Sequence, residues 1–272
     1  MYPELLHLGP FVVSSYGFMM VLAFMACYFF LQAEGRRLEW EPELAQDLVF
    51  WAAMGGVAGA KIYYLIENIG RGAGRNIAGL GELFLGLFTL DLQRMAAGIQ
   101  NFGAGLVFFG GLMGGMLAVT LLLRRRGKAW LPMADTVAPA LILGYAIGRV
   151  GCFLVGDDYG VPSTLPWALA FPNGLPPTTL TVHPTQIYEF LLGLGIFGGL
   201  YYLRTRTRFV GQLFSLYLIL VGTERFIIEL IRTNRQYVLG LTGAQLIGSL
   251  MVLLGLALLY YLPRRETAAA TG

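Results

Sequence analysis

Long apolar stretches, separated by short polar segments, occupy most of the chain. A helix of about 20 apolar residues spans the hydrocarbon core of a bilayer, and seven stretches come close to this length. They cover residues 16–33, 47–66, 98–123, 133–155, 186–203, 209–230 and 242–262. The pattern predicts an all-α, polytopic membrane protein with seven transmembrane helices.

One further apolar segment does not fit this scheme. Residues 76–93, with the sequence NIAGLGELFLGLFTLDLQ, are interrupted by Glu82, Asp91 and several glycines. We expect an interfacial or re-entrant arm here, with an eighth span as the alternative. Since the sequence contains no linker and no convincing repeat, we expect residues 1–263 to form a single integral membrane domain. Residues 264–272 are expected to form a short disordered tail in the cytoplasm.

Composition agrees with the membrane class. Hydrophobic residues make up 56% of the chain and charged residues 13%, and the mean hydropathy is +0.64. A soluble domain carries nearer a quarter of charged residues, so the composition excludes a water-soluble protein. Two glycine-rich segments, GGVAGA at 55–60 and GGLMGG at 110–115, favour close packing of two helices. A glycine-lined path for a lipid chain is the alternative.

Basic residues are distributed asymmetrically between the loops. Eleven follow the first, third, fifth and seventh spans: Arg36, Arg37, Arg124, Arg125, Arg126, Lys128, Arg204, Arg206, Arg208, Arg264 and Arg265. Five lie on the opposite side: Arg71, Arg75, Arg94, Arg232 and Arg235. Because cytoplasmic loops are enriched in Lys and Arg, we expect the N-terminus outside and the C-terminus in the cytoplasm. Topology explains these short basic clusters, so they do not indicate nucleic-acid binding.

The longest outward loop, residues 156–185, is rich in proline and carries the aromatic residues Trp167 and Phe171. Proline fixes φ and cannot donate a backbone hydrogen bond, so the loop should be stiff and non-helical. It is either an interfacial loop with an aromatic-belt residue or a rigid, outward-facing cap over a cavity.

Three charged clusters lie at the outer ends of predicted spans. They are Arg149 with Asp157, Asp158 and Tyr159; His183 with Gln186, Tyr188 and Glu189; and Arg225 with Glu229 and Arg232. Charged side chains in a membrane are costly and usually functional, so we expect the clusters to converge on one cavity. Arginine forms paired hydrogen bonds to phosphate oxygens, which favours a phospholipid headgroup as ligand. An internal salt-bridge network that fixes helix order is the alternative.

No metal or cofactor is expected. The chain contains two cysteines, Cys27 and Cys152, and two histidines, His7 and His183. The cysteines lie far apart in apolar surroundings, and this set does not make a plausible Cys/His zinc site.

Five motifs together resemble the prolipoprotein diacylglyceryl transferases, bacterial membrane enzymes that lipidate the N-terminal cysteine of lipoprotein precursors. These are HLGPFVVSSYG, GLVFFGGLMGG, GRVGCFLVGDDYG, VHPTQIY and ERFIIELIR, and their order and spacing match almost end to end. The resemblance implies a multi-pass protein of the bacterial plasma (inner) membrane. It also implies transfer of the diacylglyceryl group of phosphatidylglycerol to the thiol of the lipobox cysteine in the prolipoprotein signal peptide, with release of glycerol 1-phosphate.

The resemblance also assigns roles to individual residues. Arg149 matches the principal phosphatidylglycerol-binding arginine, and Arg225 matches the second essential arginine, so these two are the expected catalytic residues. The other expected substrate-binding residues are Tyr16, Asp157, Gly160, Glu229, Arg232 and His183. Asp157 stands where the family usually has glutamate, and His183 is more plausible as a structural or headgroup-contacting residue than as a base.

Some positions depart from the family pattern. Cys152 and Val155 replace asparagines of the signature, and Phe109 replaces a histidine proposed as the base. Another group, such as Asp157 or Tyr16, or the departing phosphate with solvent, would have to take the thiol proton. A divergent relative with a changed acceptor is a further alternative. The competing functional class is a transporter or flippase for an anionic lipid or solute, although such proteins usually show internal repeats.

Overall fold

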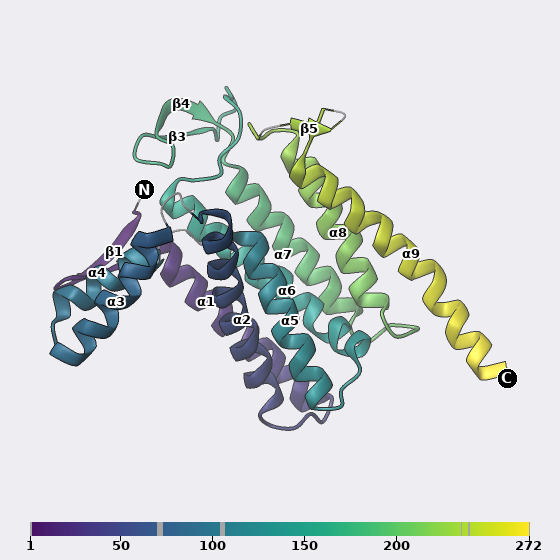
Figure 1. Cartoon of the computed structure of the whole chain (residues 1–272). Helices are drawn as coiled ribbons and strands as arrows, with labels where there is room; N and C mark the ends of the chain where they lie inside the picture. Colours follow the sequence, from purple (N-terminus) through teal and green to yellow (C-terminus); the bar gives the residue numbers. More distant parts are fainter. Residues whose placement is uncertain (1, 70–72, 104–106, 235, 239, 272) are drawn as a thin grey trace. The chain divides into compact units, whose positions relative to one another are not determined.

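The computed structural model describes residues 2–69, 73–103, 107–234, 236–238 and 240–271 (Figure 1). Within these residues the chain is mostly helical, with nine helices, which agrees with the predicted class. The chain divides into two compact units. One consists of Met1–Leu5, Ser14–Glu39 and Ala129–Gly272, and the other of Leu6–Val13 and Trp40–Lys128.

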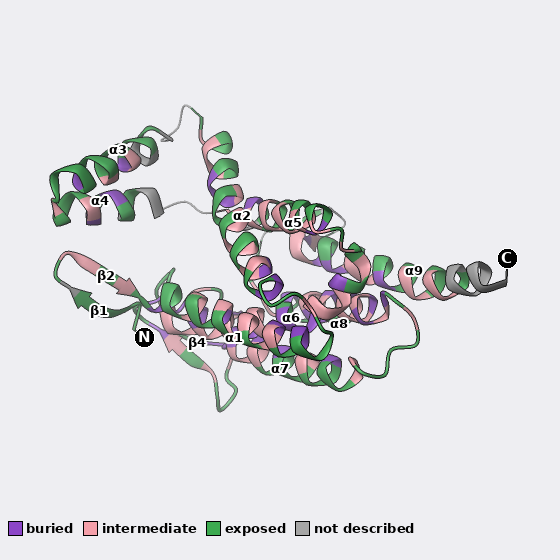
Figure 2. Ribbon diagram, turned by 90° about the horizontal axis from the view of Figure 1, so that it is seen from below, coloured by how far each residue is buried: buried purple, intermediate pink, exposed green. Residues whose placement is uncertain are grey.

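The first unit is built around α6 (Trp130–Val155). This helix packs against α1 (Ser15–Arg37), α7 (Thr185–Leu203) and α8 (Gln212–Glu229), and α8 in turn packs against α9 (Gly243–Thr271). The buried side chains of Ile142, Leu200 and Leu213 form a hydrophobic cluster between α6, α7 and α8. Figure 2 colours the ribbon by burial, with buried positions along these helices in purple. A continuous α9 also replaces the expected disordered tail as far as Thr271.

Short strands accompany the helices, which the sequence did not predict. The loop after α6 contains β3 (Leu169–Phe171) and β4 (Thr178–Val182), which pair antiparallel. The loop after α8 contains β5 (Gln236–Val238) and β6 (Leu241–Thr242), also antiparallel. Near the N-terminus, β1 (Glu4–Leu8) pairs with β2 (Phe11–Ser14). These hairpins satisfy backbone hydrogen bonds in segments that prolines and glycines keep from forming helices.

The second unit contains two helix pairs. Helix α2 (Leu44–Glu67) packs against α5 (Phe108–Arg125), and α3 (Ala73–Thr89) packs against α4 (Leu92–Gly103). The prediction of one span over 98–123 was wrong, because α4 ends at Gly103 and the extended N-cap residue Val107 precedes α5. The segment 76–93, predicted as an arm, lies in α3 and the start of α4, on either side of the positive-φ residue Leu90.

Among the described residues, four helices are long and apolar enough to cross a membrane: Ser15–Arg37, Leu44–Glu67, Trp130–Val155 and Gly243–Arg264. Helix α7 carries Gln186 and Glu189 in its first turns. Helix α8 carries Glu224, Arg225 and Glu229. Except for Glu224, these polar side chains belong to the charged clusters predicted from the sequence.

Glycines bring α2 and α5 into backbone contact. A Cβ atom built on Gly59 would lie 2.3 Å from the carbonyl oxygen of Gly110, and one built on Gly114 would lie 2.2 Å from that of Gly55. Small residues at both faces allow such close approach. The glycine motifs therefore serve tight helix packing, as the first of the two alternatives predicted.

We expect Gly59→Ala to destabilise the protein by about 1 to 3 kcal/mol, the usual cost of overpacking. Thermal unfolding in detergent measures this effect. Gly81→Ala in α3 is the matched control, because nothing lies within 4 Å of a Cβ atom at that position. Equal melting temperatures for both variants would contradict close packing at Gly59.

Candidate active site

The candidate site lies where α6 ends, α7 begins and α8 ends. Gly156 ends α6 with φ of 79°, and its N–H donates to the Cys152 carbonyl at 2.8 Å. The Thr185 hydroxyl donates to the backbone oxygen of Asp158 at 2.6 Å, so the start of α7 holds the loop that follows α6. The Val161 N–H donates to the Ile231 carbonyl at 2.8 Å and attaches the same loop to the end of α8.

Glu189 is the centre of the ion-pair network. Its side chain is fully buried, and its Oε1 lies 2.9 Å from Nη1 of Arg225, 3.3 Å from Nη2 of Arg149 and 3.7 Å from Nη1 of Arg232. The Tyr145 hydroxyl also donates to this oxygen at 2.9 Å. One carboxylate from the second predicted cluster therefore joins arginines from the other two. The three clusters meet, as expected, and the cavity expected between them stays a prediction.

Asp158 links the same arginines from the loop side. One carboxylate oxygen accepts from Nη1 of Arg149 at 2.9 Å, and the other accepts from Nη2 of Arg232. Its φ of 61° is a left-handed backbone conformation that few residues other than glycine adopt. Burial alone would raise the pKa of Asp158, but the guanidinium groups of Arg232 and Arg149 outweigh it and lower the pKa. Asp158 is therefore held as a carboxylate.

Glu229 completes the network on α8. Its Oε2 lies 3.5 Å from Nη2 of Arg225, one turn earlier on α8, and 3.9 Å from Nε of Arg232. The spacing in the sequence predicts one helical face for all three residues, but α8 ends at Glu229 and Arg232 lies beyond it, in a β-bridge with Gly160. Its Oε1 accepts a hydrogen bond from Asn234 at 2.7 Å.

Several buried polar atoms of the site have no hydrogen-bond partner in the structure. They are Oε2 of Glu189, Oε2 of Glu229, Oε1 of Gln186, Nη1 of Arg232 and Oδ1 of Asp157. Buried polar atoms without partners are rare and usually mark a functional place.

Tyr16 lies beside the helix that carries Arg149. It is the second residue of α1, and a Cβ atom built on Gly151 of α6 would lie 3.3 Å from its Cδ2. Its ring is partly exposed, and its hydroxyl lies within electrostatic range of Asp157 and Arg149. The structure thus brings Tyr16 to the edge of the network.

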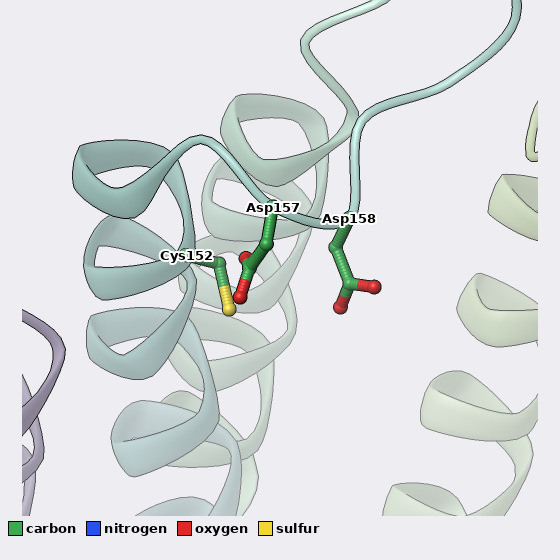
Figure 3. A group of neighbouring side chains, drawn as sticks. All are labelled: Cys152, Asp157 and Asp158. Atoms are coloured by element: carbon green, nitrogen blue, oxygen red, sulfur yellow. The ribbon is translucent and has the colours of Figure 1, made fainter. Parts of the chain in front are cut away.

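The side chain of Asp157 points toward that of Cys152 (Figure 3). Burial, followed by the neighbouring charge of Asp158, raises the pKa of Asp157. One ligand atom each from Cys152, Asp157 and Asp158 lies within 4.8 Å of the others. Because both carboxylate oxygens of Asp158 already bind guanidinium groups, this donor set does not fit a metal ion.

His183 belongs to a different hydrogen-bonded group. Its Nδ1 lies 3.3 Å from the Tyr188 hydroxyl, which accepts a hydrogen bond from the Trp167 indole N–H at 2.7 Å. The backbone carbonyl of His183 accepts from the N–H of Gly160 at 2.9 Å. His183 therefore supports the loop through its backbone, and its ring contacts that of Tyr188.

Sequence reasoning omitted three residues from the expected site. Glu189 appeared in a cluster but received no role, while Tyr145 and Glu224 were not considered. Tyr145 precedes Arg149 by one helical turn, and Glu224 directly precedes Arg225. Helical spacing could have indicated Tyr145. Phe109 lies near the start of α5 and belongs to the second unit.

We expect the stability contributed by Asp158 to depend on pH. A carboxyl group whose pKa is lowered by folding stabilises the protein above its unfolded pKa of about 4 and loses that contribution as the pH falls through the folded value. Asp158→Asn should cost on the order of 1 kcal/mol at neutral pH, because solvent screens these partly exposed pairs. Melting temperatures should converge with those of the wild type toward pH values of about 3.

Asp157→Asn is the control for that measurement. Folding raises the pKa of Asp157, so the ionised form of this residue destabilises the folded protein. The protein therefore loses stability as the pH rises and Asp157 ionises. The asparagine variant should therefore be as stable as the wild type, or more so, at neutral pH. Equal destabilisation by both substitutions would contradict the opposite pKa shifts of Asp157 and Asp158.

The fold and the site together define a helical membrane protein with three arginines gathered around buried carboxylates. A family model described as prolipoprotein diacylglyceryl transferase matches residues 3–261. The chain belongs to this family, as the five motifs predicted.

Relatives named phosphatidylglycerol–prolipoprotein diacylglyceryl transferase match nearly the whole chain. One from Pseudomonas aeruginosa is 30% identical, over 98% of this chain and 95% of its own length. One from Gloeobacter violaceus is 32% identical, over 97% of this chain and 94% of its own length. One from Nitratidesulfovibrio vulgaris is 33% identical, over 85% and 80%.

Proposed function

We propose that this protein transfers the diacylglyceryl group of phosphatidylglycerol to the thiol of the lipobox cysteine of prolipoproteins, releasing glycerol 1-phosphate. The observation that carries the proposal is the buried Glu189 with Arg149, Arg225 and Arg232 around one of its oxygens. These arginines belong to motifs of the family to which the chain belongs. Guanidinium groups in such a site match the phosphodiester of the lipid.

In the proposed reaction, a thiolate of the precursor attacks the glycerol carbon that bears the phosphate. A carbon–sulfur bond forms, the carbon–oxygen bond breaks, and its electron pair stays on the phosphate oxygen. Arg149 and Arg225 meet the negative charge that develops on this leaving group, so they stabilise the transition state more than the ground state. Tyr16, Gly160, Glu229, Arg232 and His183 would form or support the binding site around the headgroup.

We assign Asp157 as the base that accepts the thiol proton. A free thiol is only slightly ionised at neutral pH, so a base is needed. Phe109 stands where the family pattern described above has a histidine proposed as that base. Asp157 combines a raised pKa with a buried carboxylate oxygen that has no hydrogen-bond partner. A base with a pKa closer to the working pH holds a transferred proton better.

The proposed topology places the site at the outer surface of a bacterial inner membrane. We propose that α5, α7 and α8 cross the bilayer together with the four more apolar helices, giving seven spans, and that the segment 76–93 lies at the interface. The loop 156–185 would then cap the site from outside. The basic asymmetry of the loops supports an outer N-terminus and a cytoplasmic C-terminus.

Single cysteines test this orientation. In a cysteine-free background, Thr178→Cys in β4 should react with a membrane-impermeant reagent added outside. Arg206→Cys, after α7, should react only when the membrane is permeabilised. The reverse pattern would place the charged clusters on the cytoplasmic side and overturn the topology.

The function itself is tested in phosphatidylglycerol vesicles with a lipobox peptide that contains one cysteine. We expect the peptide to gain the mass of a diacylglyceryl group and glycerol 1-phosphate to appear in equal amount. A peptide in which serine replaces the cysteine is the control. Movement of lipid or solute across the vesicle without peptide modification would instead support the alternative, a transporter or flippase.

A further inference from the structure

The Tyr145 hydroxyl lies between two buried carboxyl groups on different helices. It is 2.9 Å from Oε1 of Glu189 on α7 and 3.4 Å from Oε1 of Glu224 on α8. On the other side of the same residue, the Arg149 guanidinium lies 4.8 Å from the centre of the Tyr145 ring. Tyr145 therefore contacts the principal arginine through its ring and the central carboxylate through its hydroxyl.

Counting protons assigns a state to Glu224. A hydroxyl has one proton to donate, and the shorter contact and the surrounding guanidinium groups direct it to the ionised Glu189. The Tyr145 oxygen then offers only lone pairs to Glu224, so a hydrogen bond between them requires a proton on Glu224. An ionised Glu224 would instead place two negative oxygens around a hydroxyl that can satisfy one of them.

The surroundings of Glu224 support the same state. The residue is 4% exposed, and its Oε2 is buried without a hydrogen-bond partner. Among the described residues, the site arginines Arg149, Arg225 and Arg232 form ion pairs with Asp158, Glu189 and Glu229 but not with Glu224. An ionised carboxylate buried without a partner is very costly, whereas a neutral acid with one hydrogen bond is not.

We propose that Glu224 is a neutral acid that donates to Tyr145, and that the Glu224–Tyr145–Glu189 chain positions Arg149 for an anionic phosphate ester. A neutral Glu224 leaves the arginine charge available, because a further carboxylate beside the site would repel the phosphate. Tyr145 holds the face of the guanidinium and, by donating to Glu189, weakens the hold of that carboxylate on the arginines. Both residues are positioning residues, and this role rests on the proposed function.

Infrared spectroscopy tests the proton without any assay of activity. The wild-type protein in an ester-free detergent at neutral pH should show the C=O band of a protonated carboxylic acid, and Glu224→Gln should lack it. Tyr145→Phe should shift the band, because the acid loses its acceptor. The proposal would be overturned if the wild-type spectrum lacks this band, or if the spectrum of Glu224→Gln keeps it unchanged. Either result would count against the proposal even if diacylglyceryl transfer is confirmed.

Kinetics then test the positioning role. Tyr145→Phe keeps the ring but removes the hydroxyl, and we expect kcat/KM for phosphatidylglycerol to fall about tenfold. Glu224→Leu should lower it about fivefold, whereas Glu224→Gln, a neutral donor of similar size, should restore at least half of the wild-type value.

Tyr28→Phe in α1 is the matched control, because its hydroxyl contacts Gln32 on the same helix and lies outside the network. Its kcat/KM should stay at the wild-type value. Full activity of Tyr145→Phe, or equal losses in Glu224→Gln and Glu224→Leu, would overturn the positioning role while the infrared band still reports the proton.

Discussion

Arg149→Ala is expected to reduce diacylglyceryl transfer a hundredfold or more, which corresponds to about 2.7 kcal/mol of lost transition-state stabilisation. The guanidinium is held at fixed distances from Asp158, Glu189 and the Tyr145 ring. It therefore meets the leaving phosphate without reorganising, and this is the condition under which electrostatic stabilisation is largest. Initial rates of lipobox-peptide modification in phosphatidylglycerol vesicles measure the effect.

Arg149→Lys separates charge from geometry. Lysine keeps the positive charge but loses the planar pair of donors that now contacts two carboxylates. We expect a loss of tenfold or more, about 1.4 kcal/mol. Arg206→Ala removes the same charge from an exposed position after α7, where the side chain stacks on Tyr202, and should leave the rate unchanged. A wild-type rate in folded Arg149→Ala would mean that the reaction takes place elsewhere.

The parts of the site that could be predicted from the sequence are those fixed by helical spacing and by membrane energetics. Arg225 and Glu229 share a helical face because they are four residues apart, and Arg232 stays near Glu229 although α8 ends before it. The meeting of Arg149 and Glu189 could be predicted because charged side chains at the ends of apolar segments avoid lipid by pairing. Neither argument needs an atomic structure.

The remaining features depend on tertiary contacts that no local pattern specifies. Tyr145 resembles any aromatic residue on an apolar helix until its hydroxyl is seen between two carboxyl groups. The strands β3 and β4 form in a proline-rich loop because their partners supply the backbone hydrogen bonds. Residues 98–123 looked like one span because hydropathy averages over the extended backbone at Val107 that precedes α5.

The second large effect is expected at Gly160, which has no side chain to contribute to binding. Its N–H donates to the His183 carbonyl, and it forms an antiparallel bridge with Arg232. A Cβ atom at this position would lie 2.5 Å from the carbonyl oxygen of Ile231 and 2.9 Å from Cγ2 of Thr185. A backbone oxygen cannot rotate away as a side chain can, so Gly160→Ala must displace the segment that carries Arg232.

We expect Gly160→Ala to lower the rate of transfer at least tenfold and the free energy of unfolding by about 1 to 3 kcal/mol. The loss of activity should persist well below the melting temperature, because Arg232 moves away from Asp158 while the helices remain folded. Gly198→Ala in α7 is the control, since nothing lies within 4 Å of a Cβ atom there. If Gly160→Ala is less stable but fully active when folded, the contact between this loop and the end of α8 supports the fold without positioning Arg232.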